Sequence, residues 1–195
     1  MARSESGEAG RTAGGRDGGP SRFSAVGRAV YRWPWLLNLW GPFVGNGIRV
    51  VEATRDWRYV RVELRQHWWN KNLVGTAFGG ALFAMCDPFY MVMLVINLGP
   101  DYLVWDRTAT IHFRRPGRGT VNAEFRLSAE QIAAVRAAAD RDGRHDATFT
   151  VTVTDAEGTT VAEVEKVIYL RSRKSQAGAA SPAVDSPRSA RSSAG

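Results

Sequence analysis

The sequence predicts an α+β domain in which a curved antiparallel sheet wraps around one long central helix. Residues 81–98 are apolar on nearly every side, and a helix that is apolar all round must be buried. Several other stretches alternate apolar and polar residues, which is the pattern of antiparallel strands with one buried and one wet face. The central helix is the only predicted element that is long and apolar enough to cover those faces, so we expect the sheet to curve around it.

The strands are expected at residues 48–52, 59–65, 103–113, 121–127, 147–154 and 159–170. In the third of them, an unbroken alternation would place Trp105 and Phe113 on the buried face and Asp106 on the wet face. A shorter helix is expected after the fourth strand, where Ser128 begins a capping box and Gly143 marks the end.

Composition divides the 195 residues into four parts. Residues 1–22 and 173–195 are rich in Gly, Ser, Ala, Pro and Arg without periodicity, and we predict that they are disordered tails. Residues 23–45 are dense in Trp and Leu, are interrupted at Pro34, and are predicted to form a helical extension of the α+β domain at 46–172. Membrane association of this Trp-rich segment is an alternative. Packing against its own domain is the favoured interpretation.

The net charge of +7 does not indicate a nucleic-acid partner. Residues 1–22 and 171–195 supply +1 and +4 of it, which leaves +2 for residues 23–170. The chain has no RNA-binding or helix-turn-helix signature, and a weakly basic tail gives at most non-specific attraction to polyanions. No specific nucleic-acid binding is therefore expected.

A cytoplasmic protein without metal or cofactor is expected. The N-terminal residues have no apolar segment of the kind found in a signal peptide. The apolar run at 77–98 is long enough to span a membrane, but Asp87 and Pro88 near its middle favour a buried core helix. The single cysteine, Cys86, excludes an intramolecular disulfide, and the three scattered histidines lack the spacing of zinc ligands.

The carboxylate of Asp87 lies inside this apolar segment and needs an explanation, because an isolated buried charge is costly unless it is paired, protonated or used. Gly79 and Gly80 at the helix start offer unpaired backbone N–H groups and no side chains, an arrangement that can hold an oxyanion. Asp87 could then attack a carbonyl or act as general base. The amide of Asn72 could orient the carbonyl or the water.

Helix geometry adds a condition. Eight helical residues would separate Gly79 from Asp87 by about 12 Å, so one carbonyl cannot contact both in a single subunit. Their cooperation would require at least a dimer. The alternative interpretation of Asp87 is structural, because Asp followed by Pro88 is a good helix cap, with the carboxylate bonded to the amides of Phe89 or Tyr90.

Several motifs resemble those of the hotdog-fold thioesterases over about residues 46–172: Asn72 with Gly75, then Phe78-Gly79-Gly80 entering the helix, and Asp87 inside it. Others are similar to a bacterial hotdog family classed as a domain of unknown function: Trp40-Gly-Pro-Phe43, Asp87-Pro-Phe-Tyr90 and Ile111-His-Phe-Arg-Arg-Pro116. The resemblance implies hydrolysis of acyl thioesters, with acyl-CoA as the expected substrate. It also implies a site at the interface of a homodimer or of a dimer of dimers.

Phe78 occupies a position where many hotdog thioesterases have His, and this departure opens a second interpretation. An acyl pocket would still be lined by Gly80, Phe78 and Phe83, and Arg114 and Arg115 could pair with the phosphates of coenzyme A. The alternative function is a non-catalytic hotdog protein that binds acyl-CoA or lipid. Dehydration of a hydroxyacyl thioester also suits the fold but normally needs a histidine.

Overall fold

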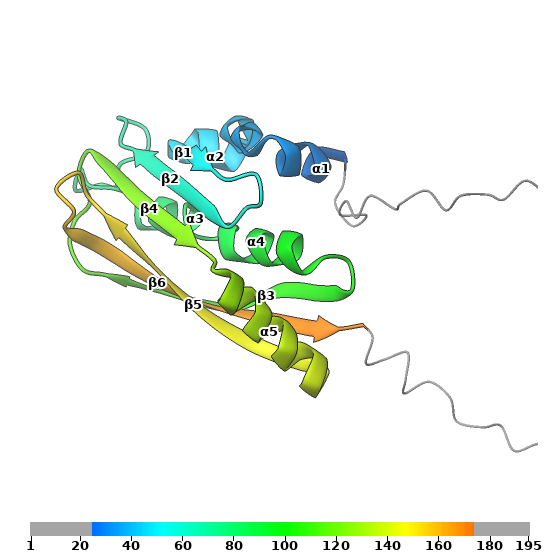
Figure 1. The fold of residues 1–195 in the computed structure, drawn as a ribbon. Coiled ribbons are helices and arrows are strands. Elements are labelled where there is room, and N and C mark those ends of the chain that lie inside the picture. The colour runs from blue at the N-terminus through cyan, green and yellow to red at the C-terminus, as the bar shows by residue number, and fades with distance from the viewer. Residues whose placement is uncertain (1–24, 174–195) are drawn as a thin grey trace, which may run out of the picture.

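The computed structural model describes residues 25–173, and the predicted tails lie outside the described residues except for Arg173. Helical segments and strands follow one another along the chain, as Figure 1 shows. The helical segments are α1 (Ala25–Arg32), the 3₁₀ helix η1 (Pro34–Leu39), α2 (Gly41–Asn46), α3 (Gly79–Ala84), α4 (Phe89–Leu98) and α5 (Ala129–Asp142). The strands are β1 (Ile48–Ala53), β2 (Tyr59–Arg65), β3 (Tyr102–Phe113), β4 (Thr120–Arg126), β5 (Arg144–Thr154) and β6 (Thr160–Ser172).

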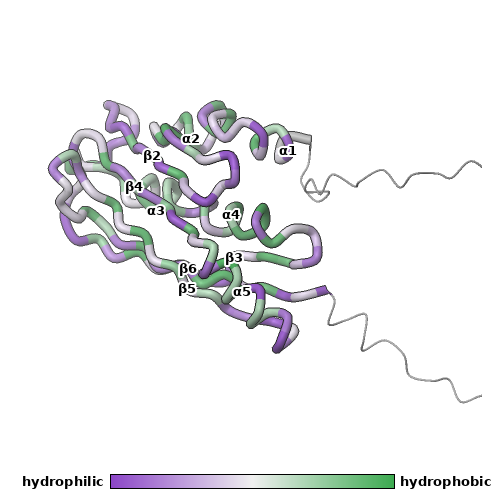
Figure 2. Tube along the Cα trace, in the orientation of Figure 1, coloured by the Kyte–Doolittle hydropathy of each residue, from purple (hydrophilic) through white to green (hydrophobic). Residues whose placement is uncertain are grey.

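The strands form one antiparallel sheet in the order β1-β2-β4-β5-β6-β3, and α4 lies against its concave side. Two aromatic pairs connect the helix to the middle of the sheet. The ring of Phe89 lies 4.8 Å from that of Phe125 on β4, and Tyr90 stacks on Phe149 of β5 at 4.7 Å. Figure 2 shows α4 mostly in green, as expected for the apolar helix around which the sheet curves. The predicted α+β architecture is confirmed.

The central helix is broken, as the alternative in which a helix restarts at Pro88 predicts, and is not continuous as in the distance estimate from Gly79 to Asp87. Helix α3 ends at Ala84 and α4 begins at Phe89, with Pro88 at the break. Proline has no N–H to donate to the carbonyl of Ala84, so the helical ladder cannot run through. Residues Gly79–Leu98 are long and apolar enough to cross a membrane by length and composition. Here half of this segment is buried inside the fold, as in a core helix.

The alternation predicted for β2 is confirmed, because Val60, Val62 and Leu64 are all buried. The prediction for β3 is wrong at its start. A bulge at Arg107 shifts the register, so that Trp105 is 69% exposed and Asp106 is turned inward. An extra residue in a strand turns the side chains that precede it to the opposite face of the sheet, and a strict period of two in the sequence cannot reveal this. Phe113, also expected on the buried face, is exposed.

The N-terminal segments pack on β1 through a specific contact. The side-chain amide of Asn38 on η1 accepts from the Val50 N–H at 2.7 Å and donates to the Val50 carbonyl at 3.0 Å. The Asn38 amide therefore satisfies both backbone groups of a residue on the edge strand. At the other end of the domain, Ser128 and Gln131 form the predicted capping box of α5, which ends at Gly143 in the left-handed conformation.

Candidate functional site

A cavity of about 400 Å³ opens beside the start of α3, between the loop that precedes this helix and the turn that follows β3. Four residues singled out in the sequence lie along it, namely Asn72, Gly79, Arg114 and Arg115. The rest of the lining is Thr76, Ala77, Leu82, Phe113, Pro116 and Gly117. Phe78, Gly80, Phe83 and Asp87 are not part of this lining.

Two phenyl rings occupy the space above the glycines. A β carbon on Gly79 would lie 3.0 Å from Cζ of Phe113, and one on Gly80 would lie 2.4 Å from Cε1 of Phe78. Both rings are about half exposed. The helical ladder begins with the amides of Ala81 and Leu82, which both donate to the Phe78 carbonyl. The N–H groups of Gly79 and Gly80 therefore precede the first hydrogen bonds of the helix, and Gly79 lines the cavity.

The side chain of Asn72 organises the loop. Its Oδ1 accepts from the amides of Val74 at 3.1 Å and Thr76 at 3.0 Å. Its Nδ2 donates to Thr76 Oγ1 at 2.7 Å and to the Ala77 carbonyl at 3.4 Å. An amide side chain has two acceptor lone pairs and two donor hydrogens, so these bonds use its full capacity. Asn72 thus holds the loop in place at the cavity wall.

The two arginines differ in how they are held. Arg114 donates from Nε and Nη2 to Oε2 of Glu163 on β6, at 2.9 and 2.6 Å. Arg115 is exposed, and its guanidinium has no hydrogen bond or ion pair within residues 25–173, although its backbone N–H donates to the Val161 carbonyl. Arg115 is therefore the guanidinium that could pair with an anionic group without first losing a partner. Phe83 lies half-buried on α3.

Asp87 lies in the break between α3 and α4, with its side chain 52% exposed. It does not cap α4, which has no side-chain cap. Its Oδ1 instead accepts from Nζ of Lys166 on β6 at 3.0 Å, and the same ammonium group donates to the backbone carbonyl of Asp87. The helix-cap interpretation of this carboxylate is not what the structure shows.

Lys166 is the residue that the sequence analysis missed. Its side chain is fully buried, and its Nζ lies 3.0 Å from Asp106 Oδ1 on the neighbouring strand β3. The sequence does contain a signal, because Lys166 stands two residues from both Val164 and Ile168 and so lies on the same buried face of β6. A lysine in such a register requires partners. Asp87 and Asp106 provide them.

The charge on Asp106 is held by proximity rather than by a directed bond. No hydrogen bond reaches its buried Oδ1 from the described residues, although the ammonium group is at ion-pair distance. Burial raises the pKa of Asp106, an effect that Lys166 opposes and the nearby Asp87 reinforces. Burial also raises the pKa of the Cys86 thiol to about 12, so this cysteine is not a nucleophile at neutral pH.

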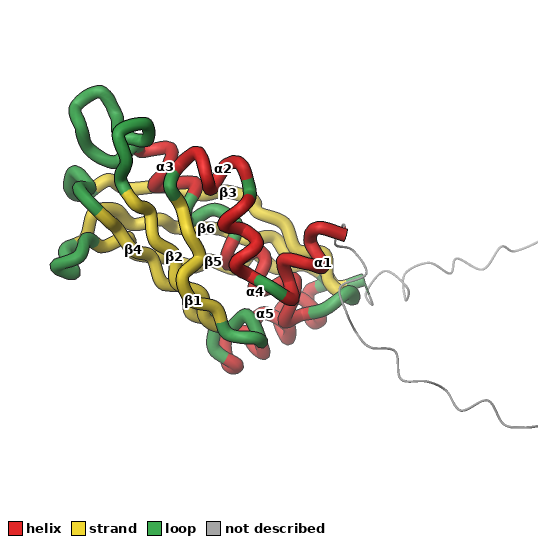
Figure 3. Tube along the Cα trace, turned by 90° about the horizontal axis from the view of Figure 1, so that it is seen from above, coloured by secondary structure: helices red, strands yellow, loops and turns green. Residues whose placement is uncertain are grey.

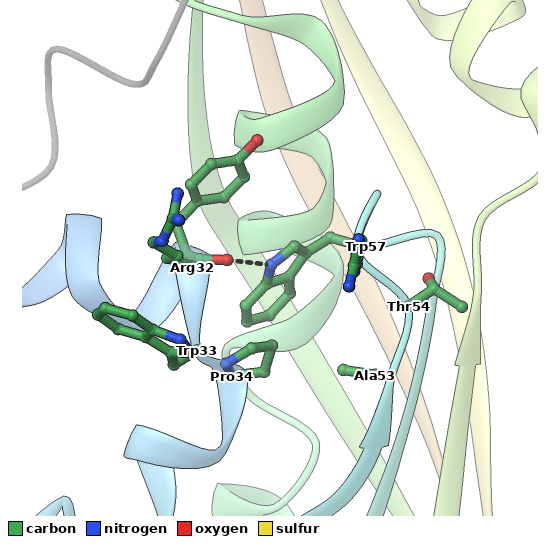
Figure 4. Close-up of a pocket in the computed structure, with 8 residues that line it drawn as sticks. Arg32, Trp33, Pro34, Ala53, Thr54 and Trp57 are labelled. Atoms are coloured by element: carbon green, nitrogen blue, oxygen red, sulfur yellow. Dashed lines mark hydrogen bonds between the residues drawn. The ribbon is translucent and has the colours of Figure 1, made fainter.

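Two further cavities involve the N-terminal segments. One is an apolar groove of about 500 Å³ that ends against Pro88, the residue after Asp87; it is lined by Val30, Leu36, Leu37, Leu39, Trp40 and Gly41. The other, of about 470 Å³, lies between α1, η1 and the β1–β2 turn. Figure 4 shows it with Trp33 and Pro34 opposite Ala53 and Thr54, and with the Trp57 indole donating to the Tyr31 carbonyl at 2.9 Å. Figure 3 shows α1 and α2 along one side of the sheet.

The part of the chain that the structure describes contains no cluster of three or more His, Cys, Asp or Glu side chains that could hold a metal ion.

Residues 33–170 match the family model of a domain of unknown function, DUF4442. The chain belongs to the DUF4442 family. The match covers the η1 and α2 segments and nearly the whole sheet, and therefore includes every residue of the candidate site. No curated protein sequence matches the chain.

Solved structures place this DUF4442 chain among hotdog-fold proteins. It is 25% identical to PA5026 of Pseudomonas aeruginosa, described as a probable thioesterase, with a TM-score of 0.59 over 75% of this chain and 94% of that one. The thioesterase HI1161 of Haemophilus influenzae is 11% identical, with a TM-score of 0.53 over 72% and 89%. OLEI01261 of Chlorobaculum tepidum, a protein of unknown function, is also 11% identical, with a TM-score of 0.58 over 75% and 94%. The chain therefore has the hotdog fold of thioesterase-like proteins.

Proposed function

We propose that this DUF4442 protein hydrolyses acyl thioesters, with acyl-CoA as the substrate. The observation that carries the proposal is the cavity at the start of α3. It brings Gly79, Asn72 and two arginines together in a fold shared with proteins described as thioesterases. We also place the reaction in the cytoplasm and assign it no metal or cofactor.

The cavity residues have complementary roles. The Gly79 amide, free of the helical ladder, stabilises the oxyanion that forms on the thioester carbonyl. Asn72 orients the reacting group by fixing the loop that forms the cavity wall. Arg115, and Arg114 if it releases Glu163, pair with the phosphates of coenzyme A.

Asp87 is the general base or nucleophile, and we infer that it acts on a thioester held by a neighbouring subunit. Asp87 is absent from the cavity that contains Gly79, and its carboxylate is half exposed. Strand β3 is at the end of the sheet, and exposes Trp105 and Phe113. Pairing through this edge would give a homodimer or a dimer of dimers, and would close the site from two chains.

The apolar groove beside Pro88 is suited to the acyl chain. It includes Pro88, the residue after the proposed base, and is otherwise lined by aliphatic residues, Gly41 and Trp40. We also assign Phe78, Gly80 and Phe83 to acyl binding, although they do not line this groove. A separate proposal is that the N-terminal extension binds lipid surfaces through the exposed Trp33 and Trp35. Co-sedimentation with vesicles tests it.

A second candidate function is acyl-CoA or lipid binding without turnover. It is favoured by the phenyl ring at Phe78, which cannot transfer a proton. It is also favoured because the Asn72 side-chain amide is already fully hydrogen-bonded to its own loop. On this proposal acyl-CoA binding is saturable and indifferent to Asp87→Asn.

The deciding experiment is thiol release from short, medium and long acyl-CoAs by the wild type and Asp87→Asn. Asp142→Asn serves as a matched control at an exposed carboxylate at the end of α5. We expect turnover in the wild type and the control and a large loss in Asp87→Asn. Binding without turnover in the wild type would instead support the second candidate, and equal turnover in all three proteins would remove Asp87 from the mechanism.

A further inference from the structure

We propose that Lys166 is a positioning residue for Asp87. Its buried ammonium group holds Oδ1 and the backbone carbonyl of Asp87 at the helix break, and Asp106 holds the ammonium group from the other side. This role rests on the proposed function, because it concerns how the reacting carboxylate is oriented.

The ammonium group is matched by the oxygens around it. Lysine has three N–H donors. Two oxygens of Asp87, its carbonyl and Oδ1, accept hydrogen bonds from Nζ, and Asp106 Oδ1 lies 3.0 Å away. A fully buried ammonium group is tolerated only when charge and hydrogen bonds compensate for lost water. The side chain is therefore fixed, and its Nζ provides a rigid point of attachment.

The break in the central helix makes this attachment possible. The first bond of the α4 ladder runs from the Val92 N–H to the Pro88 carbonyl, so the Asp87 carbonyl lies outside the ladder. Lys166 binds that carbonyl and the carboxylate of the same residue together. Backbone and side chain of Asp87 are thus constrained by one group.

The arrangement leaves one carboxylate oxygen for chemistry. Among the described residues, the hydrogen bond to the Asp87 carboxylate is made through Oδ1, while the side chain remains 52% exposed. A base that is both fixed and accessible has the geometry that catalysis needs, since a misplacement of about 1 Å can cost about 100-fold in rate.

The test uses Lys166→Arg, which keeps the positive charge, and Lys166→Met combined with Asp106→Asn, which removes the buried cation and one carboxylate together so that folding is favoured. Ile168→Val, on the same buried face of β6, controls for a general disturbance of the core. We expect the double variant to lose kcat by about 100-fold with little change in KM, because Lys166 does not touch substrate. Lys166→Arg should be intermediate, and Ile168→Val should match the wild type.

A second measurement does not depend on activity. The ¹⁵N NMR signal of the buried Lys166 ammonium group should exchange slowly in the wild type and shift in Asp87→Asn. If the wild type is active, either of two results overturns the positioning role alone. One is an NMR signal that does not shift in Asp87→Asn, and the other is an unchanged kcat in a folded double variant. A wild type that hydrolyses no acyl thioester overturns the proposed function, and the positioning of Asp87 for that reaction with it, whatever the NMR signal shows.

Discussion

The phenyl ring of Phe113, at the end of β3, lies over Gly79, at the start of α3. Its Cζ is 3.0 Å from the position that a β carbon on Gly79 would take. The ring and the glycine both line the cavity. A side chain from a strand far away in sequence therefore covers Gly79 at the cavity.

Replacement of Gly79 by alanine should reduce turnover with little loss of stability. The added methyl group must displace the half-exposed Phe113 ring and would stand at the approach to the amide. We expect kcat/KM to fall while the free energy of unfolding changes by less than about 1 kcal/mol. Gly45→Ala, where no atom lies within 4 Å of the new β carbon, is the control. Unchanged turnover in a folded Gly79→Ala variant would show that the substrate does not reach the site through the space between Gly79 and the Phe113 ring.

Replacement of Asn72 by alanine should release the loop before α3. The amides of Val74 and Thr76 lose their acceptor, so their hydrogen exchange should accelerate, and the local cost should be about 1–3 kcal/mol. Thr76→Val is a matched control, since it removes only the Oγ1 contact and leaves both bonds to Asn72 Oδ1. Unaltered protection of Val74 in Asn72→Ala would show that the side chain does not hold the loop.

The raised pKa of Asp106 predicts an unusual dependence of stability on pH. A carboxyl group whose pKa is higher in the folded state favours folding most when it is protonated, and this contribution is lost as pH rises from 3.8 through the raised value. Asp106→Asn should therefore gain stability relative to the wild type as pH increases across that window. Urea unfolding between pH 3 and pH 7 measures the difference.

Asp142 provides a control of opposite sign for this titration. Its hydrogen bond to Arg141 lowers the pKa of Asp142, so its contribution is present at neutral pH and lost as pH falls. Asp142→Asn should lose stability relative to the wild type as pH increases. Parallel trends in the two variants would contradict the assignment for Asp106.

Self-association through β3 should depend on Trp105, which is 69% exposed on this edge strand. If the wild type forms the proposed dimer, we expect Trp105→Arg to shift it toward monomer in analytical ultracentrifugation, because a charge replaces apolar contact surface. Trp68→Arg is the control, since Trp68 is 85% exposed but lies in a loop. A dimer that persists in Trp105→Arg and dissociates in Trp68→Arg would move the interface away from β3.

The sequence was informative where one element can be interpreted by itself. The alternation of Val60, Val62 and Leu64 and the capping box at Ser128 depend on neighbours in the chain, and both predictions are confirmed. The same reasoning singled out Asp87 but not its partners. Lys166 and Asp106 meet across paired strands, and their approach depends on the bulge at Arg107. A bulge has no local pattern of polarity, so the inward turn of Asp106 could not be predicted from alternation.

The contact between Asn38 and Val50 has a consequence for how far an assembly of this chain can extend. At the β1 end of the sheet, the side-chain amide occupies both backbone groups of Val50, so a further strand cannot be added there in regular register. At the opposite end, β3 is the last strand of the described sheet. With the proposed pairing through β3, growth by edge pairing would therefore stop at two chains, and a closed pair would form in preference to an open-ended fibre.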